Sequence, residues 1–371
     1  MDRFRTILFA FLLLSAGCGS GSNVFRITGQ TMGTTYNIVV VDRNNLIDEQ
    51  NLRVAVEETL IEVNAVFSNW DKKSEVSRFN ALETTKPIEI SKEFADIISL
   101  SERIHTSSDG AFDITLGPLV ELWGFGAQKR KVSLEQTERP SAEEIAVAKR
   151  LVGHNRLLQL SEDGKTLRKS DPRTSVYLAA IAKGHGIDRV AYALSNLGLN
   201  DYMVEIGGDL IAKGVNPEGK PWRIGIERPD ASQGTVQQVI EVSGHGMATS
   251  GDYRNYYEKN GRRYTHIIDG VTGEPIRHLT ASVTVLGETA AKADAWATAL
   301  LVLGEARGLA IAENQDIAAL FITRSQSADR QSNETQSNKS TGSAIQFKLT
   351  SSTEFDKIQQ GMAVDHETIA H

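Results

Sequence analysis

The chain has 371 residues and carries 47 Asp and Glu against 40 Lys and Arg, which gives a formal net charge of -7 at pH 7. The basic residues are spread along the sequence and form no stripe, which argues against nucleic acid as a partner. A single cysteine excludes an internal disulfide. With 40% hydrophobic residues, the chain can bury a large core as one domain or as two interleaved ones.

The first residues predict export and a lipid anchor. Arg3 and Arg5 precede an apolar run at 7–14 that is too short to span a membrane, and small residues then lead to Cys18. This pattern is typical of a bacterial lipoprotein signal peptide over 1–17 with acylation of Cys18. An ordinary secretory signal is the alternative. Both interpretations predict a protein outside the cytoplasm, and the first predicts a periplasmic or other extracytoplasmic protein bound to a membrane by lipid.

Strand and helix patterns alternate through the first half of the globular part, which follows a short tether at 18–23. Alternating β-branched residues at 24–41 predict a strand pair, or one long strand, broken at Met32-Gly33-Thr34. Apolar residues three or four apart predict an amphipathic helix that ends near Phe67. Further elements are a helix from Ser91 to about 107, a helix from a Ser141/Glu144 capping box to Gly153, and strands at 157–160 and 166–168.

The second half of the chain is predicted to hold more strands. A helix at 187–197 precedes a strand at 202–213 with a bulge at Gly207-Gly208, and a hairpin then turns at 259–261. Helices at 290–303 and 305–313 precede a strand at 318–323. The Ser-, Gln- and Asn-rich stretch 324–343 is interpreted as an insertion in a terminal hairpin. The globular domain is therefore expected over 24–350, with 351–371 as a tail.

The helix at 290–303 carries the first candidate for chemistry. Asp294 and Thr298 are four residues apart, so a carboxylate and a hydroxyl project from one face and can converge on a hard cation. Mg²⁺ is usually held by one or two carboxylates together with substrate phosphates and water, so this pair predicts a phosphate-bearing ligand. The alternative is a polar stripe that faces solvent.

Four other residues stand out, three of them with a structural alternative. Lys183 near a helix start can meet a phosphate. Trp70, in a polar loop, can stack on a planar ligand or form a packing lid. Asp113, isolated among apolar residues, is either a buried hydrogen-bonded acid or a ligand contact. His266 alternates with apolar neighbours, which is also typical of a core histidine. Neither a G-x-G-x-x-G motif nor a P-loop is present.

Eight motifs in order make these segments resemble one known family. They are MGTTY from Met32, SEVSRFN from Ser74, GAFDITLGPLVELWGFG from Gly110, AIAKGHGID from Ala180, VEIGGDL from Val204, ATSGDYRNY from Ala248, HIIDGVTGEP from His266 and ADAWATAL from Ala293. Together they resemble the ApbE family of periplasmic flavin transferases, the FAD:protein FMN transferases. The resemblance implies an α+β fold with mixed or antiparallel sheets and packed helices, and no Rossmann or P-loop domain.

The resemblance also implies roles for particular residues. Mg²⁺ is expected at Asp294, Thr298 and the carbonyl of Ala180. Contacts with FAD, the substrate, are expected from Met32, Trp70, Ala111, Phe112, Asp113, Tyr177, Lys183 and His266. Two positions depart from the family pattern: Tyr177 stands where an Asp that contacts FAD is usual, and Gly270 replaces the first Pro of a DPxTGxP turn.

The implied reaction is attack by a threonine hydroxyl of an acceptor protein on the FMN-side phosphorus of FAD, which releases AMP and leaves a phosphoester-linked FMN. The acceptor would be an extracytoplasmic redox protein or a small flavodomain. Asp294 would serve catalysis through the metal and His266 as the base, since imidazole titrates near neutral pH. Two alternatives remain at this stage: a Mg²⁺-dependent FAD pyrophosphatase, with water as nucleophile, and a noncatalytic FAD-binding lipoprotein.

Overall fold

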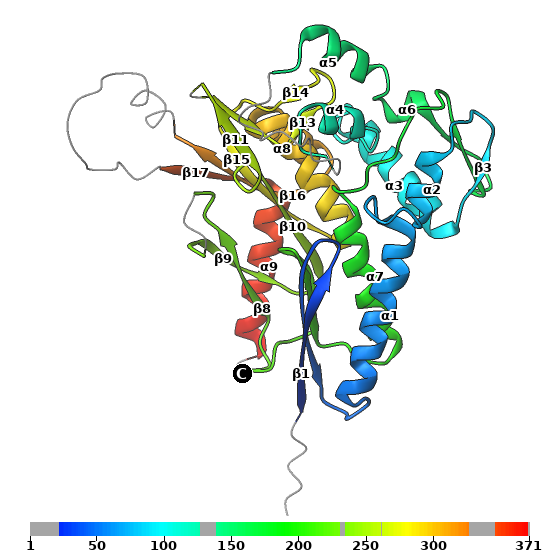
Figure 1. Cartoon of the computed structure of the whole chain (residues 1–371). Coiled ribbons are helices and arrows are strands. Elements are labelled where there is room, and N and C mark those ends of the chain that lie inside the picture. The colour runs from blue at the N-terminus through cyan, green and yellow to red at the C-terminus, as the bar shows by residue number, and fades with distance from the viewer. Residues whose placement is uncertain (1–21, 127–138, 231–233, 261, 326–345, 370–371) are drawn as a thin grey trace, which may run out of the picture.

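The computed structural model describes residues 22–126, 139–230, 234–260, 262–325 and 346–369. The predicted signal peptide, Cys18 and nearly all of the predicted insertion lie outside these residues. Helices and antiparallel sheets are combined in one fold (Figure 1), which confirms the α+β class.

An eight-stranded sheet organises the molecule. All of its neighbouring strands pair antiparallel. In spatial order the strands are β1 (Asn23–Thr31), β2 (Thr34–Asp42), β6 (Tyr202–Ile206), β7 (Asp209–Lys213), β10 (His245–Gly251), β15 (Thr280–Gly287), β16 (Ala318–Arg324) and β17 (Phe347–Ser351).

Both faces of the sheet are covered. On one face lie α1 (Glu49–Phe67), α7 (Ala182–Asn196) and α8 (Ala290–Asn314), and on the other lie β8 (Trp222–Glu227), β9 (Val236–Val242) and α9 (Thr353–Ile369). Side chains of β16 alternate between the faces, as the strand period requires. Ala319 and Phe321 pack with the α8 side chains, whereas Leu320 and Ile322 pack in the cluster that contains Phe355 of α9.

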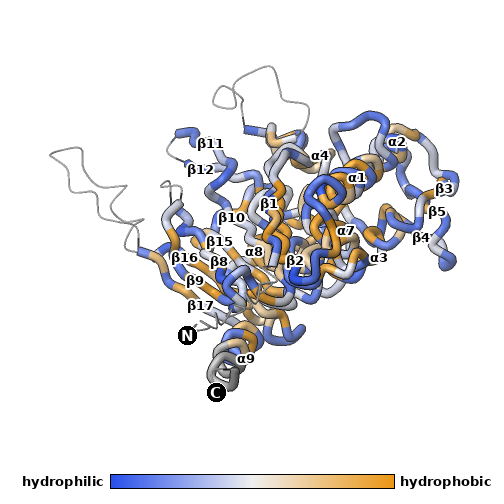
Figure 2. The backbone as a smooth tube through the Cα atoms, turned by 90° about the horizontal axis from the view of Figure 1, so that it is seen from below, coloured by the Kyte–Doolittle hydropathy of each residue, from blue (hydrophilic) through white to orange (hydrophobic). Residues whose placement is uncertain are grey.

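Smaller elements surround one end of this core. They are α2 (Glu75–Ala81), α3 (Lys92–Ser107), α4 (Gly117–Leu122), α5 (Ala142–Lys149), α6 (His154–Leu157), β3 (Ile88–Glu89), β4 (Leu158–Leu160), β5 (Thr166–Lys169), β11 (Tyr256–Lys259), β12 (Arg262–Thr265), β13 (Ile268–Asp269) and β14 (Glu274–Pro275). In Figure 2 the apolar segments gather in the middle of the molecule around α7 and α8, and the β11–β12 hairpin is hydrophilic.

Several predicted elements need correction. The break at Met32-Gly33 is a hairpin turn, as predicted, because both residues have positive φ (51° and 75°). Gly207 and Gly208 (φ 60° and 95°) also form a tight turn, between β6 and β7, so the prediction of a bulge in one strand is wrong. The helix predicted at 187–197 begins five residues earlier, at Ala182, and the one predicted to end at Gly153 ends at Lys149. The predicted tail forms α9.

Helix α8 is the central helix of the core. Gly304 has φ 73° and ψ 171°, which are not helical, so α8 consists of two helices that meet at a kink, as predicted on either side of this glycine. Among the described residues, α8 is the one helix long and apolar enough to cross a membrane by length and composition. Since 56% of its most apolar window is buried inside the fold, we interpret it as a core helix.

Candidate functional site

The predicted site residues line two pockets that share Ala179 and Lys183. The smaller pocket, of about 220 Å³, contains Met32 and Trp70. The other, of about 280 Å³, is lined by Ala111, Phe112, Asp113, Tyr177, Ala180, Lys183, His266, Asp294 and Thr298. A larger cavity of about 440 Å³ between α3, α8 and α9 is lined by none of these residues. The fold thus brings segments from most of the chain to one place.

Asp294 and Thr298 both face the larger of the two site pockets from α8. Asp294 is only 3% exposed, and its Oδ2 accepts a hydrogen bond from the backbone N–H of Gly184 at 3.2 Å. The hydroxyl of Thr298 lies 2.9 Å from that of Ser250 on β10. The alternative of a polar stripe that faces solvent is therefore wrong for this pair.

The donor set fits a hard cation. A carboxylate, a hydroxyl and a backbone carbonyl at Ala180 all offer oxygen, which Mg²⁺ prefers. Within the described ranges no group of three or more His, Cys, Asp or Glu side chains could hold an ion without help. An ion at Asp294 would therefore take its other ligands from substrate and water, as Mg²⁺ commonly does.

Lys183 lies between two carboxylates at the junction of the two pockets. Its Nζ forms an ion pair with Asp209 Oδ2 and lies 3.9 Å from Asp294 Oδ1. Burial opposes its charge, but the two carboxylates together raise the pKa of Lys183 above its ordinary value. Burial, with Asp209 adding to it and Lys183 opposing it, raises the pKa of Asp294 to about 7.

Asp209 also belongs to this cluster, although the sequence analysis predicts no role for it. It follows the Gly207-Gly208 turn at the start of β7 and is 2% exposed. Its Oδ1 accepts a hydrogen bond from Thr249 N–H at 3.2 Å, and its Oδ2 holds Lys183. A role for Asp209 could have been predicted from the sequence pattern of an acidic residue directly after two glycines, at the start of a strand in the core sheet.

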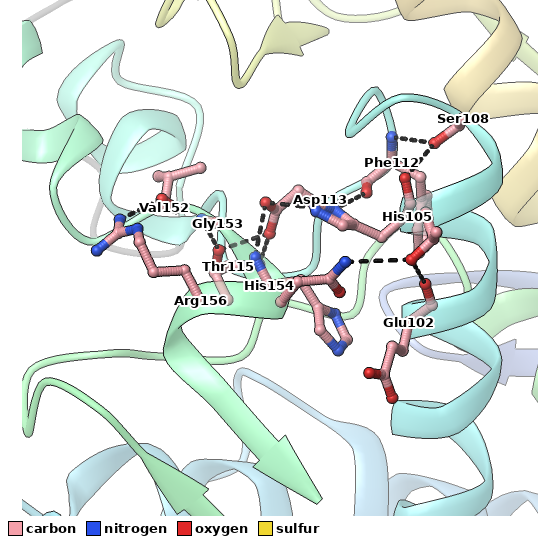
Figure 3. Close-up of polar contacts among 12 residues, drawn as sticks. Glu102, His105, Ser108, Phe112, Asp113, Thr115, Val152, Gly153, His154 and Arg156 are labelled. Carbon is pink, nitrogen blue, oxygen red and sulfur yellow. Dashed lines mark hydrogen bonds and ion pairs between the residues drawn. The ribbon is translucent and has the colours of Figure 1, made fainter.

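Asp113 lies at the centre of a buried polar network (Figure 3). Its Oδ1 accepts hydrogen bonds from the backbone N–H of Thr115 at 2.7 Å and from the Thr115 hydroxyl at 2.5 Å. Its Oδ2 accepts from the backbone N–H of His154 at 3.1 Å, and His105 Nδ1 lies 3.6 Å from the same oxygen. Of the two interpretations of Asp113, the structure favours the buried hydrogen-bonded acid.

His266 follows the end of β12 and has a defined tautomer. Its Nδ1 lies 2.9 Å from the carbonyl oxygen of Asn255. A carbonyl only accepts, so Nδ1 carries the proton and Nε2 has the free lone pair. Burial lowers the pKa of His266, against the opposing effects of Asn255 and Asp252. A neutral imidazole at the pocket wall is the form that a proton acceptor needs.

Trp70 and Tyr177 differ in their surroundings. Trp70, on the loop after α1, is 60% exposed, so its ring offers a free face at the smaller pocket. Tyr177 packs against an apolar cluster that includes Trp123. Burial and the charge of Glu121 raise the pKa of Tyr177, so its phenol stays neutral.

These features define an α+β protein in which two neighbouring pockets share Lys183 beside a buried carboxylate, an arrangement that suits a phosphate-bearing ligand. The model of the ApbE family matches residues 32–321. The chain is 42% identical over 318 residues to the FAD:protein FMN transferase of Vibrio cholerae serotype O1, covering 86% of this chain and 93% of the relative. It is 41% identical over 342 residues to that of Haemophilus influenzae, covering 89% and 97%.

Comparison with solved structures supports the same family assignment. The flavin transferase ApbE from Vibrio cholerae superposes with a TM-score of 0.78 at 38% identity, covering 91% of this chain and 99% of that one. The apo form of the Pseudomonas stutzeri flavinyl transferase ApbE gives the same TM-score at 37% identity, covering 91% and 97%. The protein belongs to the ApbE family.

Proposed function

We propose that this protein is an enzyme that transfers the FMN moiety of FAD to a threonine hydroxyl of an acceptor protein and releases AMP. The observation that carries the proposal is the junction of two pockets at Lys183, directly beside Asp294. A dinucleotide has two planar ends joined by a pyrophosphate, so it fits two pockets with a cation between them. The relatives that match most of the chain are named FAD:protein FMN transferases.

In this proposal the residues of the junction receive the pyrophosphate. Lys183 neutralises its charge, and Asp209 holds the Lys183 ammonium in place. Mg²⁺ would be held by Asp294, Thr298 and the Ala180 carbonyl and would supply positive charge for the phosphate oxygens and the leaving group. Trp70 would offer its exposed ring to one planar end of the substrate.

His266 would act as the general base that accepts the proton of the acceptor hydroxyl. The acceptor hydroxyl oxygen forms a bond to the FMN-side phosphorus while the bond between that phosphorus and the bridging oxygen breaks. The hydroxyl proton passes to His266 Nε2, which is unprotonated because Nδ1 donates to Asn255. The electron pair of the broken bond leaves with AMP.

Mass spectrometry of the acceptor tests the proposal. The protein is incubated with FAD, Mg²⁺ and a flavodomain that carries the acceptor threonine, and AMP is measured in parallel. We expect the acceptor to gain one FMN, and we expect neither a Thr→Ala acceptor nor the Asp294→Asn enzyme to give this product. AMP release without labelling of the acceptor would identify an FAD pyrophosphatase, and intact bound FAD would identify a noncatalytic binder.

We also propose that the protein acts outside the cytoplasm, bound to a membrane through lipid on Cys18. The support is the sequence order of a basic start, a short apolar run and the only cysteine. Labelling of cells with a radioactive fatty acid tests this. The wild-type protein should carry the label in the membrane fraction, and Cys18→Ser should not.

A further inference from the structure

Helices α7 and α8 meet at one joint beside the site, and Asp188 on α7 forms its polar centre. Asp188 Oδ1 accepts a hydrogen bond from Ala290 N–H at 2.7 Å, and Oδ2 accepts one from Ala291 N–H at 2.9 Å. These are the first two N–H groups of α8, which have no acceptor within their own helix. One carboxylate from α7 therefore satisfies both donors.

Where α7, α8 and β10 meet, their backbones are too close together to admit a side chain at Gly184 or Gly246. A Cβ atom on Gly184 of α7 would lie 2.3 Å from the carbonyl oxygen of Ala290. A Cβ atom on Gly246 of β10 would lie 2.4 Å from the nitrogen of Ala290. The first turn of α8 is thus in direct backbone contact with α7 on one side and with β10 on the other.

This joint determines how the site residues lie relative to one another. Asp294 follows Ala290 by about one helical turn, and its Oδ2 accepts the N–H of Gly184. Lys183 directly precedes Gly184 on α7. A shift of α8 along α7 would therefore move Asp294 and Thr298 away from Lys183 and Ala180. Asp188 lines neither site pocket.

We infer that Asp188 is a positioning residue: by binding the first two N–H groups of α8, it holds Asp294 and Thr298 in the arrangement that takes the divalent cation. This inference rests on the proposed cation site at Asp294. It assigns Asp188 no contact with FAD or with the acceptor. A purely structural role for Asp188 would change the stability of the fold and leave cation affinity unchanged.

Asp48 provides a matched control, because it caps α1 in a similar way. Asp48 Oδ1 accepts the N–H of Asn51 at 2.8 Å, at an exposed helix start whose residues line neither site pocket. The Asp188→Asn and Asp48→Asn variants of the full chain are titrated with Mn²⁺, which replaces Mg²⁺ and is detected by electron paramagnetic resonance. Hydrogen exchange of the α8 N-terminal peptide is measured on the same samples.

We expect Asp188→Asn to bind Mn²⁺ at least tenfold more weakly than wild type and to show faster exchange at the start of α8. Asp48→Asn should stay within twofold of wild type. Asp188→Glu keeps the charge but is one methylene longer, so it should also weaken Mn²⁺ binding, and it carries the test if the Asn variant does not fold.

Folded Asp188 variants that bind Mn²⁺ within twofold of wild type would overturn the inference. So would a wild-type protein that binds no Mn²⁺, which would remove the cation site as well. A wild-type protein that binds Mn²⁺ in an Asp188-dependent way but labels no acceptor would leave the inference standing and contradict the proposed transfer.

Discussion

The hydroxyl of Thr298 on α8 lies 2.9 Å from the hydroxyl of Ser250 on β10, within the pocket that also contains Asp294. Either oxygen can donate, so Ser250 can supply the proton and leave the lone pairs of Thr298 free for a cation. We predict that Thr298→Val raises the Mg²⁺ concentration for half-maximal FMN transfer by about tenfold or more, whereas Thr298→Ser stays within about threefold, because only the former loses the oxygen ligand.

The measurement is the rate of AMP release across a Mg²⁺ titration. Ser250→Ala serves as the comparison, since it removes the partner hydroxyl but not the proposed ligand, and its effect should be smaller than that of Thr298→Val. Equal Mg²⁺ requirements for Thr298→Val and wild type would show that the Thr298 hydroxyl does not hold the ion.

Lys183 is predicted to stabilise the fold as well as the substrate. Lys183→Met leaves Asp209 and Asp294 buried near each other without a cation, which should cost about 3 kcal/mol of the free energy of unfolding. Urea unfolding at pH 7.5 checks this. The double variant Lys183→Met/Asp209→Asn should regain most of the loss, because one of the two negative charges is gone. If the double variant lost as much unfolding free energy as the two single variants together, Lys183 and Asp209 would not be energetically coupled.

Asp113 is predicted to affect FAD binding indirectly, by maintaining the structure of the pocket that it lines. Asp113→Asn places an NH₂ group opposite backbone or hydroxyl donors, so we expect a loss of about 2 kcal/mol in the free energy of unfolding and weaker FAD binding together. Thr115→Val removes the hydroxyl alone and should cost about 1 kcal/mol. Urea unfolding and FAD titration give both values. Unchanged stability with lost FAD binding would instead indicate that the carboxylate contacts the ligand.

His154 is predicted to make the fold sensitive to acid. Burial lowers its pKa from 6.5 to about 4, against the opposing charge of Asp113 and with a further lowering by His105. The folded pKa lies below the unfolded one, so the stability that His154 contributes is complete above pH 6.5 and is lost as the pH falls toward 4. Between pH 7.5 and 5.0 the loss should be about 2 kcal/mol.

Urea unfolding of wild type and His154→Leu at these two pH values isolates this contribution, because other titrating groups are common to both proteins. The difference between the two proteins should change by about 2 kcal/mol over this interval. Parallel pH profiles would show that His154 does not titrate between the folded and unfolded states.

The residues whose chemistry depends on local spacing could be predicted from the sequence. Asp294 and Thr298 share a pocket because helical periodicity puts positions four apart on one face. Asp209 and Asp188 were not assigned roles, since each acts on a partner from a distant segment: Asp209 on Lys183, and Asp188 on the start of α8. No local pattern specifies which strand turn will meet which helix.

The errors in the elements have similar causes. The start of α7 at Ala182 was missed because glycines at 184 and 186 weaken helix propensity, but the close contact of Gly184 with Ala290 requires a residue without a side chain there. Helix α9 was taken for a tail, although Phe355 is 2% exposed and packs against the sheet. In both places, tertiary packing outweighed the local signal.

The direction of β1 has a consequence for how the enzyme would stand on a surface. The strand starts at Asn23 and runs for 9 residues to Thr31, directly before Met32 of the smaller pocket, and in Figure 1 its start lies at the end of the molecule away from α4 and β13. Nine residues of strand span about 30 Å. With the lipid proposed at Cys18, the anchor would join the molecule at the start of β1, about one strand length from Met32 of the smaller pocket.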